Sequence, residues 1–222
     1  MLVARRRERL EALAAELGGD TQVIAADLAR PGAAQALMAE VAALGLGVET
    51  LINNAGFGLV GRFAELDSDR QLEMIDLNVR ALTDLCRLAL PPMEERGRGF
   101  ILNVASTAAF QAGPYSAVYY ASKAYVLSLS EALHEEAKGR GVHVSALCPG
   151  PTATEFFDVA GAPGGRLAKM ATDPRAVVAA GLAGLAANKA IVIPGGKNRV
   201  GAFASRLLPR ATMRGIVAKL KG

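Results

Sequence analysis

Short apolar runs alternate along the chain with longer segments whose apolar residues return every three or four positions. Runs of the first kind predict buried strands, and segments of the second kind predict helices that cover them. The expected strands are residues 2–4, 22–26, 49–53, 99–105, 142–147 and 190–193. The expected helices are residues 6–17, 31–44, 68–90, 118–139 and 174–187, followed by two short helices within 199–220 that break at Pro209. This order predicts an α/β fold, with a doubly wound parallel sheet and helices on both faces.

Proline marks the expected end of the longest helix before residue 100. Pro91 and Pro92 are expected to stop it near Leu90, because proline lacks the N–H group that a continuing helix needs. No linker, repeat or low-complexity block interrupts the alternation of elements. Residues 1–222 are therefore expected to form a single domain, with a basic helical tail at about 197–222.

Two polar side chains in the expected helix 118–139 form a candidate catalytic pair. Tyr119 and Lys123 are four residues apart, so both lie on one face of the helix. An ammonium beside a phenol stabilises the phenolate, so the pair predicts a tyrosine whose pKa falls below the usual value of about 10. Such a tyrosine could transfer a proton at neutral pH. Of the four tyrosines, only Tyr119 has a lysine four residues later, and the alternative is an ordinary amphipathic helix face.

Further motifs stand in a fixed order around this pair. They are Asn53-Asn54-Ala55-Gly56, Asn78 within Leu77-Asn78-Val79, Ser106 at the end of Asn103-Val104-Ala105-Ser106, and Pro149-Gly150-Pro151-Thr152. Together with the tyrosine and lysine, they resemble the motifs of the short-chain dehydrogenase/reductase family from the first residue to about Gly196. The resemblance implies a Rossmann-like fold and an enzyme that moves hydride between a nicotinamide and a carbonyl or alcohol carbon.

The resemblance also implies roles for four side chains. Tyr119 would be the acid in reduction and the base in oxidation, and Lys123 would assist it and hold the nicotinamide ribose. Ser106 would donate a hydrogen bond to the substrate oxygen, and Asn78 would hold a water beside the lysine. The alternatives are a strand-end or capping hydroxyl for Ser106 and a helix residue that bonds locally for Asn78.

The chain departs from the family at its start. Family members open with a strand and a glycine-rich TGxxxGxG turn, whereas residues 1–7 read as the end of the family's second strand. No other glycine-rich turn replaces it, since residues 161–165 come too late and residues 56–58 belong to the asparagine motif. The expected fold therefore lacks the first strand and first helix, and two strand edges face each other across a gap. A sheet that closes up, a second chain in the gap and a wrong start are the explanations, and the wrong start is favoured.

The expected coenzyme follows from the basic residues after the first strand. Arg5 and Arg6 stand where NAD enzymes usually carry a carboxylate, and a guanidinium can bind a phosphate through two hydrogen bonds. NADP(H) is therefore favoured over NAD(H), the alternative being a solvated helix start. Asp27 resembles the family's acidic residue beside the adenine, or else caps a helix. By resemblance, the remaining coenzyme contacts are expected from Leu28, Asn54, Ala55, Gly56, Tyr119, Lys123, Pro149, Gly150, Thr152 and Thr154.

The substrate is expected to bind over residues 108–115 and 155–170. The second stretch holds apolar side chains suited to a lid, namely Phe156, Phe157, Val159, Leu167 and Met170. An apolar ketone or alcohol fits such a site, and the family resemblance implies a dimer or tetramer. The alternative function is a truncated, inactive fragment or a non-catalytic binding or scaffold domain.

Charge and composition narrow the partners further. Residues 195–222 carry seven Lys or Arg and no acidic residue, although the whole chain has a net charge of only +4. The tail is expected to be a solvated or subunit-contacting helix, and contact with a membrane surface is the less favoured alternative. Phe203 is the single aromatic residue of the tail, which argues against a nucleic-acid stacking surface.

Cysteine and histidine usage favours a cytoplasmic protein without a structural metal. Cys86 and Cys148 make no disulfide framework, and neither a secretory leader nor a long apolar run is found in the sequence. The CxxC and His/Cys spacings of metal sites are missing as well.

Overall fold

The computed structural model describes residues 1–162, 165 and 170–221. Its strands are β1 (Leu2–Ala4), β2 (Val23–Ala25), β3 (Thr50–Asn53), β4 (Gly99–Val104), β5 (Val142–Leu147) and β6 (Ile191–Val192). Its α-helices are α1 (Arg7–Leu17), α2 (Ala33–Ala43), α3 (Ser68–Ile75), α4 (Leu82–Glu95), α5 (Ala117–Glu136), α6 (Phe156–Val159), α7 (Pro174–Ala186), α8 (Gly196–Leu207) and α9 (Arg210–Lys221). A π-helical turn, η1 (Asp76–Ala81), joins α3 to α4, and a 3₁₀ turn, η2 (Thr107–Phe110), follows β4.

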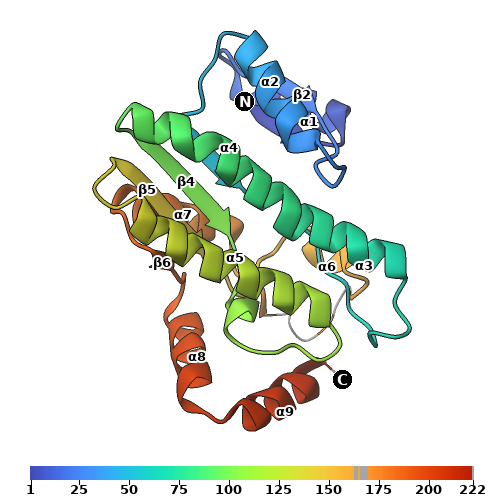
Figure 1. The fold of residues 1–222 in the computed structure, drawn as a ribbon. Helices are drawn as coiled ribbons and strands as arrows, with labels where there is room; N and C mark the ends of the chain where they lie inside the picture. The colour runs from blue at the N-terminus through green and yellow to red at the C-terminus, as the bar shows by residue number, and fades with distance from the viewer. Residues whose placement is uncertain (163–164, 166–169, 222) are drawn as a thin grey trace.

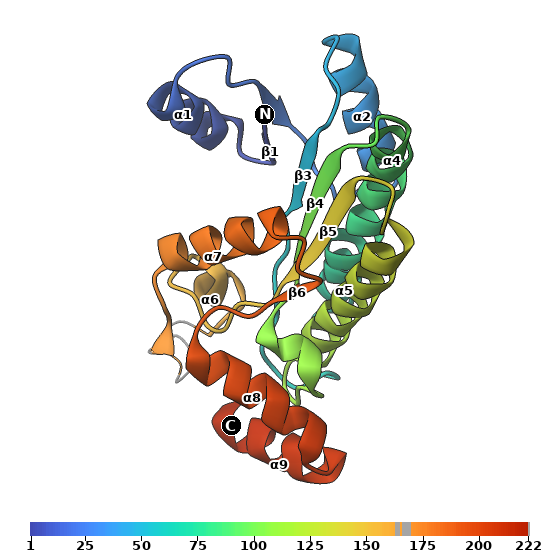
Figure 2. The ribbon, with the colours of Figure 1, turned by 90° about the vertical axis from the view of Figure 1, so that its left-hand side faces the viewer.

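The larger sheet is parallel throughout and has the strand order β3-β4-β5-β6. Helices α4 and α5 cover one face and α7 covers the other (Figures 1 and 2). Successive side chains of β4 point to opposite faces of the sheet, because side chains alternate along a strand. Ile101 packs into the cluster that lies against α4 and α5, whereas Leu102 packs with Val177 and Leu185 of α7. The expected α/β fold with helices on both faces of a parallel sheet is confirmed.

Strands β1 and β2 form a separate two-stranded sheet. Within the described residues no ladder joins β1 to β3, so each of these strands is paired on one side only. The two parts are connected through α2, since Leu37 and Val41 share an apolar cluster with Ala81 and Leu85. On β3, Ile52 is 48% exposed, which is unusual for a strand within a sheet. The fold therefore presents two strand edges that could hydrogen-bond to a further strand.

The expected helix stop at Pro91 and Pro92 is wrong. Both prolines lie inside α4, which runs on to Glu95. Met93 is fully buried in the main apolar cluster, so tertiary packing holds the last turn in helical form despite the two missing N–H donors. The helix expected from residue 68 is also interrupted by the π turn η1, and α6 and η2 were not expected at all.

The remaining helices agree with the sequence pattern to within a few residues. The two expected C-terminal helices are present as α8 and α9, separated at Pro209. Across the part of the chain that the structure describes, no helix has both the length and the apolar character that crossing a bilayer demands.

Candidate active site

The expected catalytic side chains gather at the carboxyl ends of the strands in the larger sheet. Ser106 follows β4, the stretch from Asn54 to Gly56 follows β3, and Pro149 follows β5. Helix α5 runs past this edge and brings Tyr119 and Lys123 to it. Parallel sheets bind ligands at this edge because connecting loops diverge there and leave room beside the strand ends.

Tyr119 lies under an aromatic cover and beside Ser106. The Ser106 side chain lies close enough to act on the pKa of its phenol, and Ser106 Oγ accepts a hydrogen bond from the N–H of Ala108 at 3.1 Å. The ring of Phe156 from α6 packs on the Tyr119 ring with 5.2 Å between ring centroids. Gly58 leaves room for both rings, since a Cβ there would lie 2.8 Å from Phe156 and 3.2 Å from Tyr119. Of the side chains expected to form a lid over the substrate, Phe156 packs on Tyr119, Val159 and Met170 are exposed, and Leu167 lies outside the described residues.

The expected lowering of the tyrosine pKa is wrong for this structure. Burial raises the pKa of Tyr119 to about 12, although the nearby Ser106 side chain acts in the opposite direction. The Lys123 ammonium, whose Nζ lies 5.9 Å from the centre of the Tyr119 ring, does not reverse this rise in the pKa. Desolvation disfavours the charged phenolate more strongly than the neighbouring groups stabilise it. Tyr119 is therefore held as a protonated phenol, which is the form that can donate a proton.

Lys123 is held by the backbone of the strand end. Its Nζ donates a hydrogen bond to the carbonyl oxygen of Val104 at 2.7 Å, and the side chain is buried. Burial lowers the pKa of Lys123 from 10.5 to about 8. The lysine therefore lies one helical turn from Tyr119, and its ammonium is bonded to the end of the strand that precedes Ser106.

Asn78 lies in the π turn and fixes the loop after β3. Its Nδ2 donates to the carbonyl oxygen of Phe57 at 2.9 Å, and its Oδ1 accepts from the N–H of Phe57 at 3.1 Å. The same Nδ2 donates to Ser122 Oγ at 3.1 Å, and Ser122 in turn donates to the carbonyl oxygen of Tyr119. π turns occur often at functional sites, where they redirect a side chain. Sequence reasoning did not identify Ser122, and nothing in the local pattern separates it from other helix serines.

Gly56 leaves a shallow cradle between these residues. A Cβ at this position would lie 2.8 Å from Asn78 Oδ1 and 3.6 Å from Lys123 Nζ. Asn54, Ala55 and Gly56 are all exposed, so a ligand could lie along this backbone. Four of the expected site residues, together with the glycine motif, therefore lie near one another at this edge of the sheet.

The two arginines expected to bind a phosphate are engaged with carboxylates. Arg5 pairs with Glu73 at 3.1 Å, and Arg6 pairs with Glu155 at 3.1 Å. Arg9 binds the other oxygen of Glu155. Hydrogen bonds from Arg9 and Arg6 hold the pKa of the Glu155 carboxyl below its usual value. These pairs tie the N-terminal sheet to α3 and to the loop before α6, and a phosphate would have to compete with them.

The other residues expected to bind the coenzyme lie in two places, in the turn after β2 and in the loop after β5. Asp27 accepts from the N–H of Ala29 and pairs with Arg30, which is the local role of a turn-forming carboxylate. Leu28 is buried in the apolar cluster under α2. The remainder line the loop after β5: Pro149 and Gly150 are partly buried, Thr152 Oγ1 donates to Gly150 O, and Thr154 Oγ1 accepts from Phe156 N.

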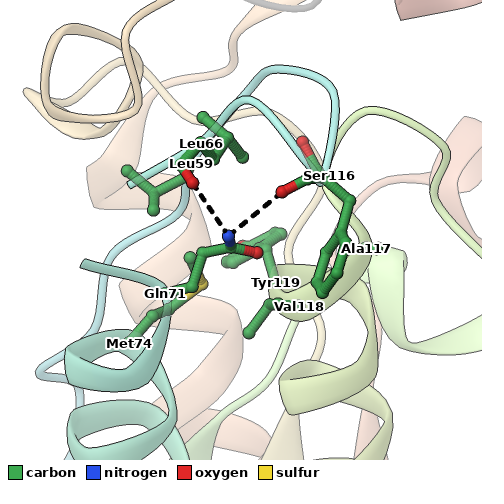
Figure 3. Close-up of a pocket in the computed structure, with 9 residues that line it drawn as sticks. Leu59, Leu66, Gln71, Met74, Ser116, Ala117, Val118 and Tyr119 are labelled. Carbon is green, nitrogen blue, oxygen red and sulfur yellow. Dashed lines mark hydrogen bonds between the residues drawn. The ribbon is translucent and has the colours of Figure 1, made fainter. Parts of the chain in front are cut away.

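Gln71 of α3 lies in a small pocket beside Tyr119 that sequence reasoning missed. Its Nε2 donates to the carbonyl oxygens of Phe63 and Leu66, each at 3.2 Å (Figure 3). These two acceptors fix the orientation of the amide, since a flipped amide would set oxygen against oxygen. Its Oε1 is buried without a hydrogen-bond partner among the described residues. The cavity, about 10 Å³, has room for about one water molecule.

Comparison with known proteins identifies relatives of similar sequence over much of the chain. The chain is 38% identical over 159 residues to the NADP-dependent 3-hydroxy acid dehydrogenase YdfG of Salmonella typhi, a match that covers 70% of this chain and 63% of that protein. It is 34% identical over 167 residues to the very-long-chain 3-oxoacyl-CoA reductase of Anas platyrhynchos, covering 71% and 53%. The match to the ketoacyl reductase HetN of a Nostoc strain is 35% over 133 residues, covering 60% and 46%. The chain thus spans about half to 63% of the length of these curated relatives.

Solved structures share the fold over nearly the whole chain. A structure of 7beta-hydroxysteroid dehydrogenase superposes with a TM-score of 0.86 at 26% identity, over 97% of this chain and 85% of that one. A short-chain dehydrogenase from Sphingobium yanoikuyae in complex with NADPH gives a TM-score of 0.79 at 31% identity, over 97% and 84%. The family model described as short chain dehydrogenase matches residues 1–162. The chain therefore belongs to the short-chain dehydrogenase family.

Proposed function

We propose that this chain carries the catalytic site of an NADP(H)-dependent oxidoreductase that interconverts a carbonyl and an alcohol on an apolar small molecule. The observation that carries the proposal is the position of Ser106 beside the Tyr119 phenol, with Lys123 bonded to the end of β4 and Asn78 bonded to the loop after β3. A phenol and a hydroxyl at one point can both donate to a single substrate oxygen. Negative charge that develops on that oxygen during hydride transfer is stabilised by such donors.

The nicotinamide, when bound, would supply the hydride in reduction or accept it in oxidation. The protein residues handle the proton. In reduction the Tyr119 O–H bond breaks and its proton moves to the substrate oxygen, while Ser106 keeps its hydrogen bond to that oxygen. In oxidation the same proton returns to Tyr119. Lys123, with a pKa lowered by burial to about 8, can exchange protons near neutral pH and so restore the protonated phenol.

The residues present fit one side of a dinucleotide. The exposed backbone of Asn54, Ala55 and Gly56 would carry the adenosine side, and the absence of a Cβ at Gly56 leaves space beside Lys123 for a ribose. No glycine-rich turn follows a strand in the sequence to hold the diphosphate. The proposal therefore includes weak diphosphate binding by residues 1–222 on their own.

The preference for NADP(H) rests on Arg5 and Arg6 and on two relatives, one named as NADP-dependent and one solved with NADPH. A 2′-phosphate would take the guanidinium groups that Glu73 and Glu155 now engage. Both ion pairs lie at the surface, where such a pair contributes little free energy. Replacing the carboxylate by the phosphate therefore costs little. An NAD enzyme would instead place a carboxylate where Arg5 stands.

The apolar cover at Phe156 supports an apolar substrate. Relatives named as 3-oxoacyl-CoA, ketoacyl and 3-hydroxy acid enzymes point to the same class, a carbonyl on an acyl chain. A single domain, assembly into a dimer or tetramer, and a cytoplasmic location are further parts of the proposal.

Replacing Tyr119 with Phe tests the proposal, since the change keeps the ring and removes the proton. NADPH oxidation with a panel of ketones should fall at least about 100-fold. Tyr125→Phe, on the same helix and bonded only to Thr83 among the described residues, is the matched control and should keep its activity. Equal activity in the Tyr119→Phe variant and the unmodified chain would contradict the assigned acid. No NADPH oxidation by the unmodified chain with any ketone would favour the second candidate, a non-catalytic binding or scaffold domain, which the divided sheet supports.

A further inference from the structure

Helix α8 exposes an apolar stripe on the side away from the protein. Val200, Phe203 and Leu207 are spaced by three and four residues, so they lie along one face of the helix. Their exposed fractions are 69%, 63% and 69%. The opposite face carries Ala202, which is buried. Large apolar side chains that gather on one exposed face mark an interaction surface, whereas isolated ones do not.

Cations lie on α8 and on the neighbouring helix α9. They include Lys197 and Arg199 on α8 and Arg210 and Arg214 on α9. No ion pair among the described residues involves a cation of these two helices. The sequence from residue 195 to 222 contains no acidic residue that could neutralise them. The surface thus combines apolar side chains with uncompensated positive charge.

The two helices are held firmly enough to present this surface. Val217 of α9 is buried against Ala108 and Tyr120. The guanidinium of Arg206 lies over the ring of Phe110, 6.0 Å from its centroid. Figure 2 shows α8 and α9 together at the end of the molecule, beyond the sheet and beside the start of α5. The apolar stripe points away from these contacts, so packing within the chain does not cover it.

We propose that the surface formed by α8 and α9 docks onto an anionic lipid bilayer. The helices would lie in the headgroup region, with Phe203 and Leu207 inserted among the upper acyl carbons and the Lys and Arg side chains at the phosphates. A second copy of this chain fits poorly, because a symmetric contact would bring two basic surfaces together. An anionic membrane supplies both the apolar phase and the opposite charge.

A tryptophan at position 203 reports the docking directly. The chain contains no tryptophan, so Phe203→Trp gives a single fluorophore on the stripe. Its emission should shift to the blue on vesicles of phosphatidylglycerol and phosphatidylcholine, and brominated acyl chains should quench it. Vesicles of phosphatidylcholine alone should leave it unchanged. Val178→Trp, on the exposed side of α7, is the matched control and should not respond to either vesicle.

Two double variants separate the contribution of the apolar stripe to membrane binding from the contribution of the positive charge. Phe203→Ser with Leu207→Ser keeps the charge and should weaken vesicle co-sedimentation at least tenfold. Leu72→Ser with Val178→Ser changes two other exposed apolar residues and should not weaken it. The double variant Arg199→Gln with Arg214→Gln should weaken vesicle co-sedimentation by about fivefold for each cation removed, measured at low salt. No co-sedimentation, or equal binding to neutral and anionic vesicles, would overturn the proposal. A change of oligomeric state in the Phe203/Leu207 variant without vesicle binding would assign the stripe to a protein contact instead.

Discussion

The ammonium of Lys123 donates a hydrogen bond to the carbonyl oxygen of Val104, with Nζ and O 2.7 Å apart. Val104 is the last residue of β4, and Ser106 follows two residues later. This hydrogen bond therefore links α5 to the end of the strand that precedes Ser106. The same contact holds an amine in a buried position, where its charge is costly.

The burial of Lys123 makes folding stability depend on pH. Its pKa is about 8 when folded and 10.5 as the ordinary value, so between these values the unfolded chain binds more protons. The free energy of unfolding should therefore rise as pH increases from 8 to 10.5. Lys123→Met lacks this group, so the difference between wild type and variant should change by on the order of 3 kcal/mol across that window. Urea titrations at the two pH values measure it.

Lys138→Met is the control for that experiment, because Lys138 is exposed and pairs only with Glu135 among the described residues. Its difference from wild type should stay constant with pH. If the curve for Lys123→Met also runs parallel to the wild-type curve, Lys123 is not held in the buried state described above.

A methyl group at position 56 should disturb the site without touching Tyr119. In Gly56→Ala the Cβ would lie 2.8 Å from Asn78 Oδ1, so the amide must move and its hydrogen bonds to Phe57 must weaken. We expect destabilisation of about 1–3 kcal/mol and weaker NADPH binding. Gly47→Ala is the control, since the nearest atom to its Cβ is 4.0 Å away. Similar stability and binding in both variants would mean that Asn78 does not depend on Gly56.

The ion pairs of the N-terminal arginines predict the relative affinities for the two coenzymes. NADPH should bind more tightly than NADH in fluorescence titrations, and Arg5→Asp with Arg6→Ala should narrow or reverse the gap. Glu155→Gln should strengthen NADPH binding, because a carboxylate no longer occupies Arg6 and Arg9. Arg7→Ala should leave the ranking unchanged, because within the described residues Arg7 forms an ion pair with Glu11 of the same helix and with no other carboxylate. Equal affinities for the two coenzymes in the unmodified chain would count against the arginine assignment.

The chain of 222 residues should bind dinucleotide weakly. Diphosphates are held in related folds by a glycine-rich turn and the helix N-terminus behind it, and no such turn follows a strand in the sequence. Calorimetry with NADPH should therefore give a dissociation constant in the millimolar range, about −4 kcal/mol. Micromolar binding would show that other backbone groups hold the diphosphate.

Much of the fold could be predicted from the sequence because the signals were local. The apolar run from Val142 to Leu147 became β5 with the expected bounds. The end of α4 could not be predicted, since the burial of Met93 decides it and burial depends on the whole fold. The π turn at Asn78 is likewise set by tertiary packing rather than by local propensity.

The candidate site could likewise be predicted only in part. The spacing of Tyr119 and Lys123 identified their shared position on α5, and the motif order placed Ser106 beside them. The sign of the pKa shift of Tyr119 could not be derived from spacing, because it follows from burial under Phe156 and neighbouring groups. The ion pairs of Arg6 depend on a residue about 150 positions away, which no local pattern reveals.

The transfer of hydride itself tests the central claim most directly. The chain would be incubated with a panel of acyl-chain ketones and NADPH carrying deuterium at C4 on one face or the other, at millimolar concentration to match the expected affinity. Mass spectrometry of the product should find deuterium from one face only, on the carbinol carbon, and Tyr119→Phe should abolish most of this product. An alcohol without deuterium from either coenzyme, or no alcohol at any NADPH concentration, would contradict the proposed oxidoreductase.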